Sequence, residues 1–235
     1  SPSGVVVVVP IYNAPEDVEV CISRLKEFTD SAVNVILIDD CSTDPRISDI
    51  LSEVDGVPPF TVLRNEENLG FTRTVNLGLR EAGDCDVVIL NSDARVTPRW
   101  LPGMLAAARS MPRVATVTPM SDRAGAFSAP NIGNENDLPP GIDEDVYARA
   151  FRRRQFGTYP VVPTGNGFCM LMTRAAIREI GFLDEESFPR GYGEENDFCM
   201  RAVRAGWHNI IDDRTYVFHE RTKSFGESKT QHIES

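Results

Sequence analysis

Cysteine, histidine and long apolar runs are all scarce in this sequence. Its 235 residues include five cysteines and three histidines. The cysteines form no close pair and no spacing typical of a metal site, and several stand inside apolar runs. We therefore expect free, buried thiols in a reducing compartment, not a disulfide framework. No stretch approaches the roughly 18 consecutive apolar residues that a membrane-spanning helix needs.

Basic residues are also in deficit. The chain has 24 Lys and Arg against 35 Asp and Glu, for a formal net charge of −11. Such a balance argues against a nucleic-acid-binding surface, which is normally basic. The start, Ser-Pro-Ser-Gly, has no basic segment typical of a signal peptide. It is compatible with a piece cut from a larger, multidomain protein.

The first half alternates short apolar runs with amphipathic segments. Strands are predicted at 5–9, 33–38, 60–63, 86–90 and 114–118. Helices are predicted from residue 15, and over 46–54, 71–82 and 98–111. This order predicts an α/β domain in which helices sandwich a mostly parallel sheet.

After residue 119 the alternation stops. Residues 120–142 predict a long loop, because Gly, Pro, Asn and Asp occur there without periodicity. Helices are expected over 143–155, 174–180 and 195–205, with a strand over 167–173. No linker divides the chain, so one domain is expected.

Polar residues follow three of the predicted strands. They are Pro10 to Asn13 after the first, Asp39-Asp40 after the second, and Asn91-Ser92-Asp93 after the fourth. Ligands of open α/β sheets bind in the crevice at the carboxyl ends of the strands. Acidic groups meeting there indicate a metal ion together with an anionic ligand.

Each of these motifs also has an ordinary structural explanation. Asp39 and Asp40 suit hydrogen bonds to a base or a ribose, but aspartate is equally common at helix N-caps and turns. Asp93 suits Mg²⁺ or Mn²⁺, yet Asn-Ser-Asp is also a common turn. A lone histidine such as His219 is usually structural, and the metal interpretation gains weight only if Asp93 lies nearby.

Three carboxylates crowd the start of the helix predicted at 195–205. Asp197 is explained by an ion pair with Arg201, four residues on. Glu194 and Glu195 are less easily explained, because the nearby glycines leave room for a ligand beside them. A carboxylate with like-charged neighbours in a cleft has a raised pKa, which suits a general base.

In order, the motifs are Val-Pro-Ile-Tyr-Asn, Ile-Asp-Asp-Cys-Ser-Thr-Asp, Arg-Asn-Glu-Glu-Asn-Leu-Gly-Phe, Leu-Asn-Ser-Asp, Gly-Phe-Cys-Met-Leu, Gly-Tyr-Gly-Glu-Glu-Asn-Asp-Phe and the late His219. With these motifs in this order, the chain resembles the family 2 glycosyltransferases of the GT-A fold. The resemblance is to the polysaccharide, O-antigen and rhamnosyltransferase-like kind, and it covers nearly the whole chain.

The resemblance implies a role for each motif. Residues 1–118 would form the nucleotide-sugar-binding half of the domain, and 119–235 the half that binds the acceptor and carries the catalytic base. Donor contacts are implied for Pro10, Tyr12, Asp39, Asp40, Asn65, Gly70, Arg73, Asn91, Ser92 and Asp93. Asp93 and His219 would bind Mn²⁺ or Mg²⁺. Glu195 would be the catalytic base, with Glu194 as the alternative. Sugar or acceptor contacts are implied for Trp100, Gly165, Asn166 and Asp197.

The implied reaction is a single inverting displacement. A sugar would pass from a UDP- or dTDP-sugar to a hydroxyl of a glycan or lipid-linked acceptor, in the cytoplasm or at the inner face of the membrane. Asn91 stands where the strict Asp-x-Asp motif has aspartate, which removes one charge from the metal site. The alternative is a degenerate GT-A domain that serves as a scaffold or glycan-binding module in a larger synthase.

Two other enzyme classes fit less well. A Rossmann dehydrogenase needs a Gly-x-Gly-x-x-Gly motif after the first strand, and residues 10–15 contain no glycine. A nucleotidyltransferase that makes sugar nucleotides usually carries an early, glycine-rich basic loop, which this sequence lacks.

Overall fold

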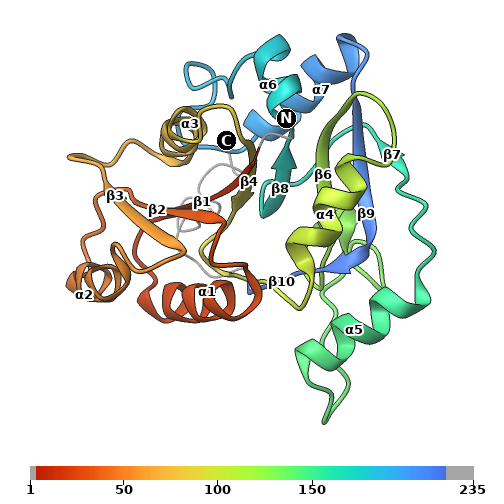
Figure 1. The fold of residues 1–235 in the computed structure, drawn as a ribbon, viewed down its shortest axis with the longest axis horizontal. Helices are drawn as coiled ribbons and strands as arrows, with labels where there is room; N and C mark the ends of the chain where they lie inside the picture. Colours follow the sequence, from red (N-terminus) through yellow and green to blue (C-terminus); the bar gives the residue numbers. More distant parts are fainter. Residues whose placement is uncertain (1–3, 221–235) are drawn as a thin grey trace, which may run out of the picture.

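The computed structural model describes residues 4–220, which form one mixed α/β domain (Figure 1). Its strands are β1 (Val5–Ile11), β2 (Asn34–Asp39), β3 (Phe60–Arg64), β4 (Asp86–Leu90), β5 (Ala94–Arg95), β6 (Val114–Met120), β7 (Val161–Val162), β8 (Cys169–Met172), β9 (His208–Tyr216) and β10 (Phe218–His219). Its helices are α1 (Pro15–Phe28), α2 (Pro45–Val54), α3 (Phe71–Glu81), α4 (Trp100–Ala108), the 3₁₀ turn η1 (Gly125–Phe127), α5 (Glu144–Arg154), α6 (Arg174–Ile180) and α7 (Glu194–Arg204).

The main sheet has the strand order β3-β2-β1-β4-β8-β6-β9-β7. The four strands from β3 to β4 are parallel, as predicted for the first half. β8 runs antiparallel between β4 and β6, and β7 runs antiparallel to β9, so the sheet as a whole is mixed. A separate pair, β5 with β10, joins the segment after β4 to the end of the described chain.

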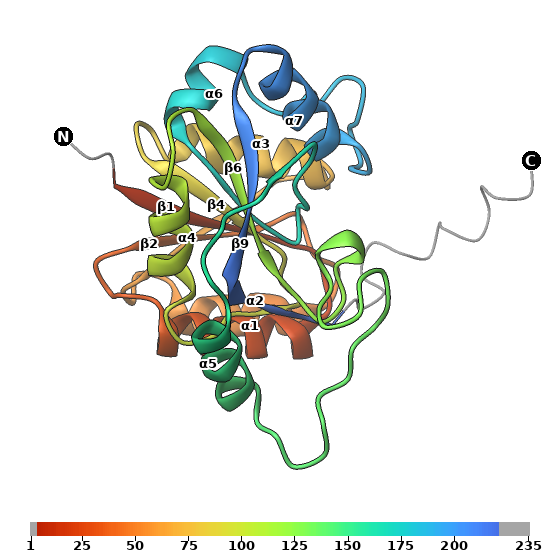
Figure 2. The same ribbon diagram turned by 90° about the vertical axis from the view of Figure 1, so that its right-hand side faces the viewer.

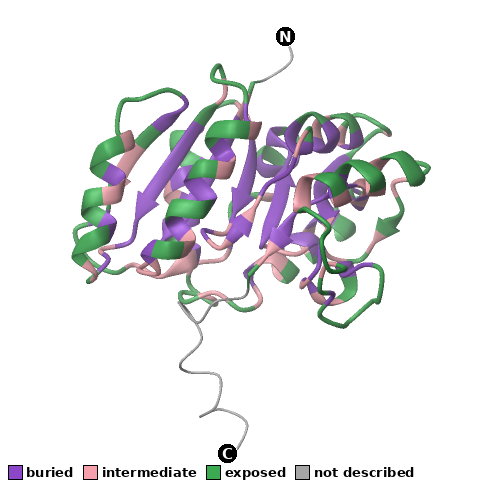
Figure 3. Cartoon of the chain, turned by 90° about the horizontal axis from the view of Figure 1, so that it is seen from below, coloured by how far each residue is buried: buried purple, intermediate pink, exposed green. Residues whose placement is uncertain are grey.

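Helices cover both faces of the sheet, and the apolar side chains between the layers are buried (Figure 3). Alternate residues of β1 divide between the two faces. Val7 and Val9 belong to the core shared with α1, α2 and α4, whereas Val6 and Val8 belong to the core shared with α3, α6 and α7. Because both faces of the central strands are covered, these strands are continuous apolar runs instead of alternating ones.

Most predicted elements are present, with small shifts at their ends. Helix α4 begins at Trp100, later than the predicted residue 98, because Arg99 has left-handed backbone angles that interrupt a helix. The nine-residue strand β9 was not predicted, because its last six residues, Ile-Asp-Asp-Arg-Thr-Tyr, lack a regular apolar alternation. The two-residue strands β5, β7 and β10 are too short to leave a pattern.

The predicted loop at 120–142 is present, with only η1 and one isolated bridge as regular structure after β6 ends. Its first part is built around Asn136, which is buried and donates to the carbonyl oxygens of Asp122 and Asn131. The loop then leads into α5 at the periphery (Figure 2).

The structure bears on two expectations drawn from composition. All five cysteines are free thiols; three are buried, while Cys41 and Cys85 are partly exposed. Across residues 4–220, no helix is both long enough and apolar enough to span a bilayer.

Candidate active site

Two neighbouring strand ends form one wall of the site. Asn13 follows β1, and its Oδ1 accepts hydrogen bonds from the backbone N–H groups of Thr43 and Asp44, each at 2.9 Å. This cross-link fixes the turn after β2 against the end of β1. Pro10 lies within β1 opposite Ile38, and Tyr12 follows it half-buried.

Asp40 organises the loop that follows β3. Its Oδ1 accepts from Asn65 Nδ2 and from the backbone N–H of Leu69, both at 2.8 Å, and its Oδ2 accepts from the backbone N–H of Gly70 at 2.9 Å. The carboxylate is almost fully buried and bonded through both oxygens to its own chain. Asp40 therefore shapes this loop, which borders an open hollow of about 520 Å³ lined by Asn65, Glu66, Glu67 and Leu69.

Asp39 is also held by the chain itself. Its Oδ1 accepts from the backbone N–H of Ser42 at 2.8 Å. Its Oδ2 lies 2.9 Å from Arg64 Nη1, an ion pair whose geometry is not that of a hydrogen bond. Asp39 therefore stabilises the turn after β2. This is the structural role that the sequence allowed as an alternative to binding a base or a ribose.

The loop after β3 touches the segment that leads into α7. A Cβ on Gly70, whose φ is 82°, would lie 2.6 Å from the carbonyl oxygen of Pro189. Thr72 donates its hydroxyl to the carbonyl oxygen of Phe188. Glycine at position 70 thus permits both the backbone angle and the close approach. Arg73, in the first turn of α3, is exposed.

The end of β4 brings Asp93 close to His219. β5 pairs with β10 so that His219 stands opposite Ala94, and the backbone N–H of Glu220 donates to the carbonyl oxygen of Asp93. His219 Nε2 lies 3.2 Å from Asp93 Oδ1, and the two side chains are only 12% and 11% exposed. The condition for a metal interpretation, proximity of Asp93 to His219, is therefore met.

Three further contacts orient His219. Its backbone N–H donates to Asp122 Oδ1 at 2.8 Å, and its ring stacks on Phe168 with the centroids 5.2 Å apart. Its Nδ1 lies 3.0 Å from the carbonyl oxygen of Arg123. Because a carbonyl oxygen only accepts, Nδ1 carries the proton. In the neutral ring, Nε2 then presents a lone pair toward the Asp93 carboxylate.

That arrangement requires a positive charge between the two side chains. A lone pair that faces a carboxylate oxygen at 3.2 Å is repulsive, unless a proton or a metal ion lies between them. Metal-binding histidines generally donate their other N–H to a carbonyl or a carboxylate, as Nδ1 does here. Asp93 and His219 therefore fit a metal ion. Residues 4–220 contain no cluster of three His, Cys, Asp or Glu side chains that would enclose one.

The other two residues of the Asn-Ser-Asp motif are less accessible than the motif suggests. Ser92 is buried, and Asn91 is half-buried. The backbone of Asn91 joins the end of β4 to the start of β8, because its N–H donates to the carbonyl oxygen of Phe168 at 2.8 Å. This bond places the Asp93 turn next to the residue on which His219 stacks.

Glu194 and Glu195 begin α7 and interact directly. Burial, and after it the charge of Glu195, raises the pKa of Glu194 to about 8. Glu194 is 4% exposed, whereas Glu195 is partly exposed. The Oε2 atoms of both lie buried without a hydrogen-bond partner among the described residues. Burial and the charge of Glu195 both favour the protonated form of Glu194, which can donate a hydrogen bond to Glu195.

The segment before β8 lies beside this pair. A Cβ on Gly167 would be 4.0 Å from the Glu195 carboxyl carbon, and the backbone N–H of Gly165 donates to Cys199 Sγ of α7 at 3.2 Å. Asn166 uses its Oδ1 to accept from the backbone N–H of Phe168. Gly165 and Asn166 thus lie near the start of α7, and their sugar or acceptor contacts stay a prediction.

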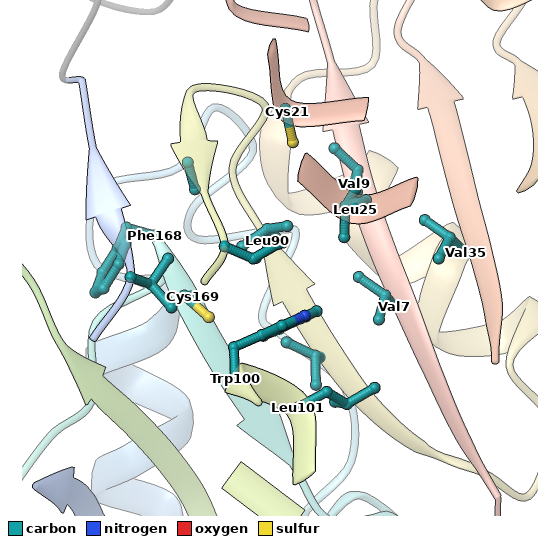
Figure 4. Close-up of a cluster of buried hydrophobic side chains, with 14 of the residues drawn as sticks. Val7, Val9, Cys21, Leu25, Val35, Leu90, Trp100, Leu101, Phe168 and Cys169 are labelled. Carbon is teal, nitrogen blue, oxygen red and sulfur yellow. The ribbon is translucent and has the colours of Figure 1, made fainter. Parts of the chain in front are cut away.

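Trp100 and Asp197, the other two predicted acceptor contacts, both interact with the chain itself, and their acceptor contacts stay predictions. Trp100 is fully buried among core side chains such as Leu90 and Leu101 (Figure 4), and its indole N–H donates to Thr29 Oγ1 at 3.3 Å. It is the first residue of a core helix. Asp197 is held at 2.8 Å by Arg201, as the simpler explanation of its position required.

Several residues that orient the site were not predicted from the sequence. Asn13 fixes the turn at 43–44, and Asp122 and Arg123 orient His219. Asn13 is the last residue of the Val-Pro-Ile-Tyr-Asn motif, so the sequence already marked it as a residue at a strand end. Asp122 and Arg123 lie in an aperiodic loop, and Arg123 acts through its carbonyl oxygen, so no sequence signal marked them.

Residues 6–181 match the family model described as "Glycosyl transferase family 2". The chain belongs to this family, and it is a glycosyltransferase. It is 26% identical, over 97% of its length and 79% of the relative, to N-acetylglucosaminyl-diphospho-decaprenol L-rhamnosyltransferase of Mycobacterium tuberculosis. It is also 26% identical, over 74% of its length, to polypeptide N-acetylgalactosaminyltransferase 4 of Caenorhabditis elegans, where the match covers 30% of the relative.

Solved structures support the GT-A fold. GalNAc-T7 with UDP, GalNAc and Mn²⁺ superposes with a TM-score of 0.72 at 18% identity, covering 93% of this chain and 44% of GalNAc-T7. The mannosyltransferase PcManGT from Pyrobaculum calidifontis, in complex with GDP-Man and Mn²⁺, gives 0.65 at 20% identity, covering 95% of this chain and 58% of its own. The chain thus spans about half the length of these solved proteins.

Proposed function

We propose that the chain is a metal-dependent inverting glycosyltransferase. It moves a sugar from a nucleoside-diphosphate sugar, of the UDP or dTDP class, to a hydroxyl of a glycan or lipid-linked acceptor. The observation that carries this proposal is the pairing of Asp93 with His219, whose Nδ1–H is fixed by the Arg123 carbonyl oxygen. A bound cation would neutralise the Asp93 carboxylate and the Nε2 lone pair of His219 together, whereas a degenerate domain would keep the two side chains only as a structural ion pair.

Asp93 Oδ1 and His219 Nε2 would hold the metal. One oxygen and one imidazole nitrogen suit Mn²⁺, and Mg²⁺ is the alternative. When bound, the ion supplies Lewis-acid chemistry that neutralises charge on the departing nucleoside diphosphate. Two solved structures of the same fold contain Mn²⁺ together with a nucleotide or a nucleotide sugar, which supports the assignment.

The donor would lie along the carboxyl ends of β1, β2 and β4. Tyr12 would flank the base, and the backbone of residues 65–70, held by Asp40, would form the floor. Both carboxylate oxygens of Asp40 are already bonded, so it contributes to donor binding by shaping this loop. Arg73 is exposed at the start of α3 and is available for a phosphate.

Glu195 would accept the proton from the acceptor hydroxyl as that oxygen attacks the anomeric carbon. Attack on the face opposite the leaving diphosphate inverts the configuration at that carbon. Glu194, whose pKa is raised by burial and by the charge of Glu195, would keep its proton, donate a hydrogen bond to Glu195 and stay out of the proton transfer. Gly165 and Asn166 would contact the sugar or the acceptor from the β8 side.

The acceptor class is inferred from a relative that matches almost the whole chain. Its name describes a rhamnosyltransferase for N-acetylglucosaminyl-diphospho-decaprenol, which favours a lipid-linked acceptor and a role in the cell envelope. We place the reaction in the cytoplasm, at the inner face of the membrane.

A thermal-shift screen tests the donor and the metal together. UDP, dTDP and GDP, and their common sugar conjugates, would be compared with and without Mn²⁺. Ligand at a hundredfold excess over its Kd raises apparent stability by roughly 2.7 kcal/mol. We expect a metal-dependent rise with one base. No rise with any donor would favour the alternative, a scaffold or glycan-binding module.

Turnover then tests the base. Donor hydrolysis with metal present would be measured for Glu195→Gln, with Glu194→Gln as the matched control. We expect Glu195→Gln to lose roughly 100-fold or more in turnover while its donor-induced thermal shift persists. Glu194→Gln should keep most of its turnover, because glutamine mimics the protonated acid. The reverse result would transfer the role of base to Glu194.

A further inference from the structure

Helix α5 is anchored on its inner side. Its first-turn acids face the body of the protein, where Glu144 pairs with Arg95 at 2.9 Å and Asp145 pairs with Arg24. Farther along, the rings of Tyr147 and Phe151 pack edge-on against Tyr216 of β9. These contacts neutralise the acids of the helix and leave its basic C-terminal half facing outward.

The outward arginines have no acidic partners. Arg149, Arg153 and Arg154 are exposed, and no ion pair involves them within residues 4–220. Arg152, by contrast, turns inward and donates to Thr215 Oγ1 and to the carbonyl oxygen of Arg99. The three outward arginines form a positively charged group on a chain whose formal net charge is −11.

An aromatic side chain protrudes next to these cations. Phe156, two residues beyond the helix, is 90% exposed, the largest exposed fraction among the large apolar side chains described. Val146, on the exposed side of α5, is 52% exposed. We define the α5 face as Val146, Arg149, Arg153, Arg154 and Phe156.

We propose that the α5 face docks on an anionic lipid bilayer. Arginines attract anionic headgroups, and an exposed aromatic ring beside them inserts at the headgroup level. The phosphates of a nucleic acid duplex would match the arginines by charge but offer no apolar surface to Phe156 and Val146. A bilayer surface accommodates both the cations and the apolar side chains, so it fits the α5 face better.

The position of the α5 face brings the proposed metal site to the membrane. Arg95 of β5, which holds Glu144 of α5, lies two residues after Asp93 and also pairs with Glu220, next to His219. Helix α5 lies at the periphery, at the opposite end of the molecule from α6 and α7 (Figures 1 and 2). Docking through α5 would therefore hold the proposed metal site beside a lipid surface.

This inference deepens the proposed lipid-linked acceptor but does not need the donor or the metal. Vesicle binding is measured without nucleotide, acceptor or Mn²⁺. If the chain does not bind vesicles, the results of the donor and turnover experiments still stand. If those experiments fail, vesicle binding still tests the docking proposal.

The test is sedimentation of the 235-residue chain with vesicles of phosphatidylcholine alone, or with about 30 mol% phosphatidylglycerol to give a negative surface potential. We expect binding to the anionic vesicles only, weakened at high salt because screening shortens the reach of the charges. Each basic side chain near such a surface contributes about fivefold in affinity. Reversing two of them, in Arg153→Glu/Arg154→Glu, should weaken binding by roughly 25-fold or more.

A matched control reverses two arginine charges on a different part of the surface. Arg109 and Arg204 are also exposed without an ion pair in the described chain, and they lie at the ends of α4 and α7. Arg109→Glu/Arg204→Glu should therefore bind vesicles nearly as well as the parent chain. Equal loss in both double variants would overturn the α5 face as the docking site.

A second measurement reports insertion directly. The two native tryptophans are buried, so Phe156→Trp adds an exposed emitter at the tip of the α5 face. We expect its fluorescence to shift to the blue and to be quenched by brominated lipid in anionic vesicles. No binding of the parent chain to anionic vesicles, equal binding to neutral ones, or retention on heparin without vesicle binding would each refute the proposal.

Discussion

Replacing Glu194 by Gln should change how the stability of the protein depends on pH. In the folded chain, burial and the charge of Glu195 raise the pKa of Glu194 to about 8, from an ordinary value of 4.5. Below pH 4.5 the group is protonated whether the chain is folded or unfolded, so it contributes nothing to the difference. Between 4.5 and 8 the unfolded chain releases the proton and the folded chain keeps it, so stability falls as pH rises.

The size of the effect follows from the shift. Each pKa unit corresponds to about 1.4 kcal/mol, so the full shift would cost roughly 5 kcal/mol of unfolding free energy above about pH 8. Glutamine is neutral at every pH, and its amide can donate to Glu195 as the protonated acid does. We therefore expect Glu194→Gln to be about as stable as the parent near pH 5, and more stable by roughly 3 to 5 kcal/mol near pH 9.

Urea unfolding at about pH 5, 7 and 9, followed by tryptophan fluorescence and circular dichroism, measures this difference. Glu179→Gln is the control, because a hydrogen bond from Arg113 lowers the pKa of Glu179. The contribution of Glu179 is therefore present at high pH and lost as pH falls, so its removal cannot produce a gain at high pH. Parallel pH profiles for Glu194→Gln and the parent would show that Glu194 is ionised in the folded protein and does not share a proton with Glu195.

Three further predictions concern the strand ends. His219→Ala should weaken Mn²⁺ binding by roughly tenfold or more, measured by calorimetry, because the metal loses its imidazole ligand; unchanged affinity would exclude His219 as a ligand. In Asp40→Asn the side-chain NH₂ would face the backbone N–H of either Leu69 or Gly70, so we expect a loss of about 2 to 4 kcal/mol in urea unfolding and weaker donor binding. Intact stability would contradict these hydrogen bonds. Trp100→Ala should cost roughly 3 to 5 kcal/mol of unfolding free energy. Trp100→Phe should keep its turnover per folded molecule, and a selective change of its acceptor KM would place Trp100 in the acceptor site.

Much of the fold follows from local patterns. The runs of β-branched residues in β1, β2 and β4, and the apolar spacing of the helices between them, predict the order of elements in the first half. The order of elements does not predict that β8 pairs antiparallel between β4 and β6. That pairing depends on where the chain re-enters the sheet after the long loop, α5 and β7. Strand β9 was missed because it buries polar residues such as Asp212 and Thr215, which a local pattern assigns to loops.

The candidate site divides in the same way. By itself, the sequence determined which polar residues stand at the carboxyl ends of the strands, because an apolar run and the break that ends it are local features. Only the tertiary structure decided what those residues touch. In the folded chain, Asp40 accepts hydrogen bonds from the loop after β3, His219 faces Asp93, and Trp100 is buried in the core. The physical reason is that hydrogen-bond partners and burial are set by segments far apart in the sequence, which meet only when the sheet and its helices pack together.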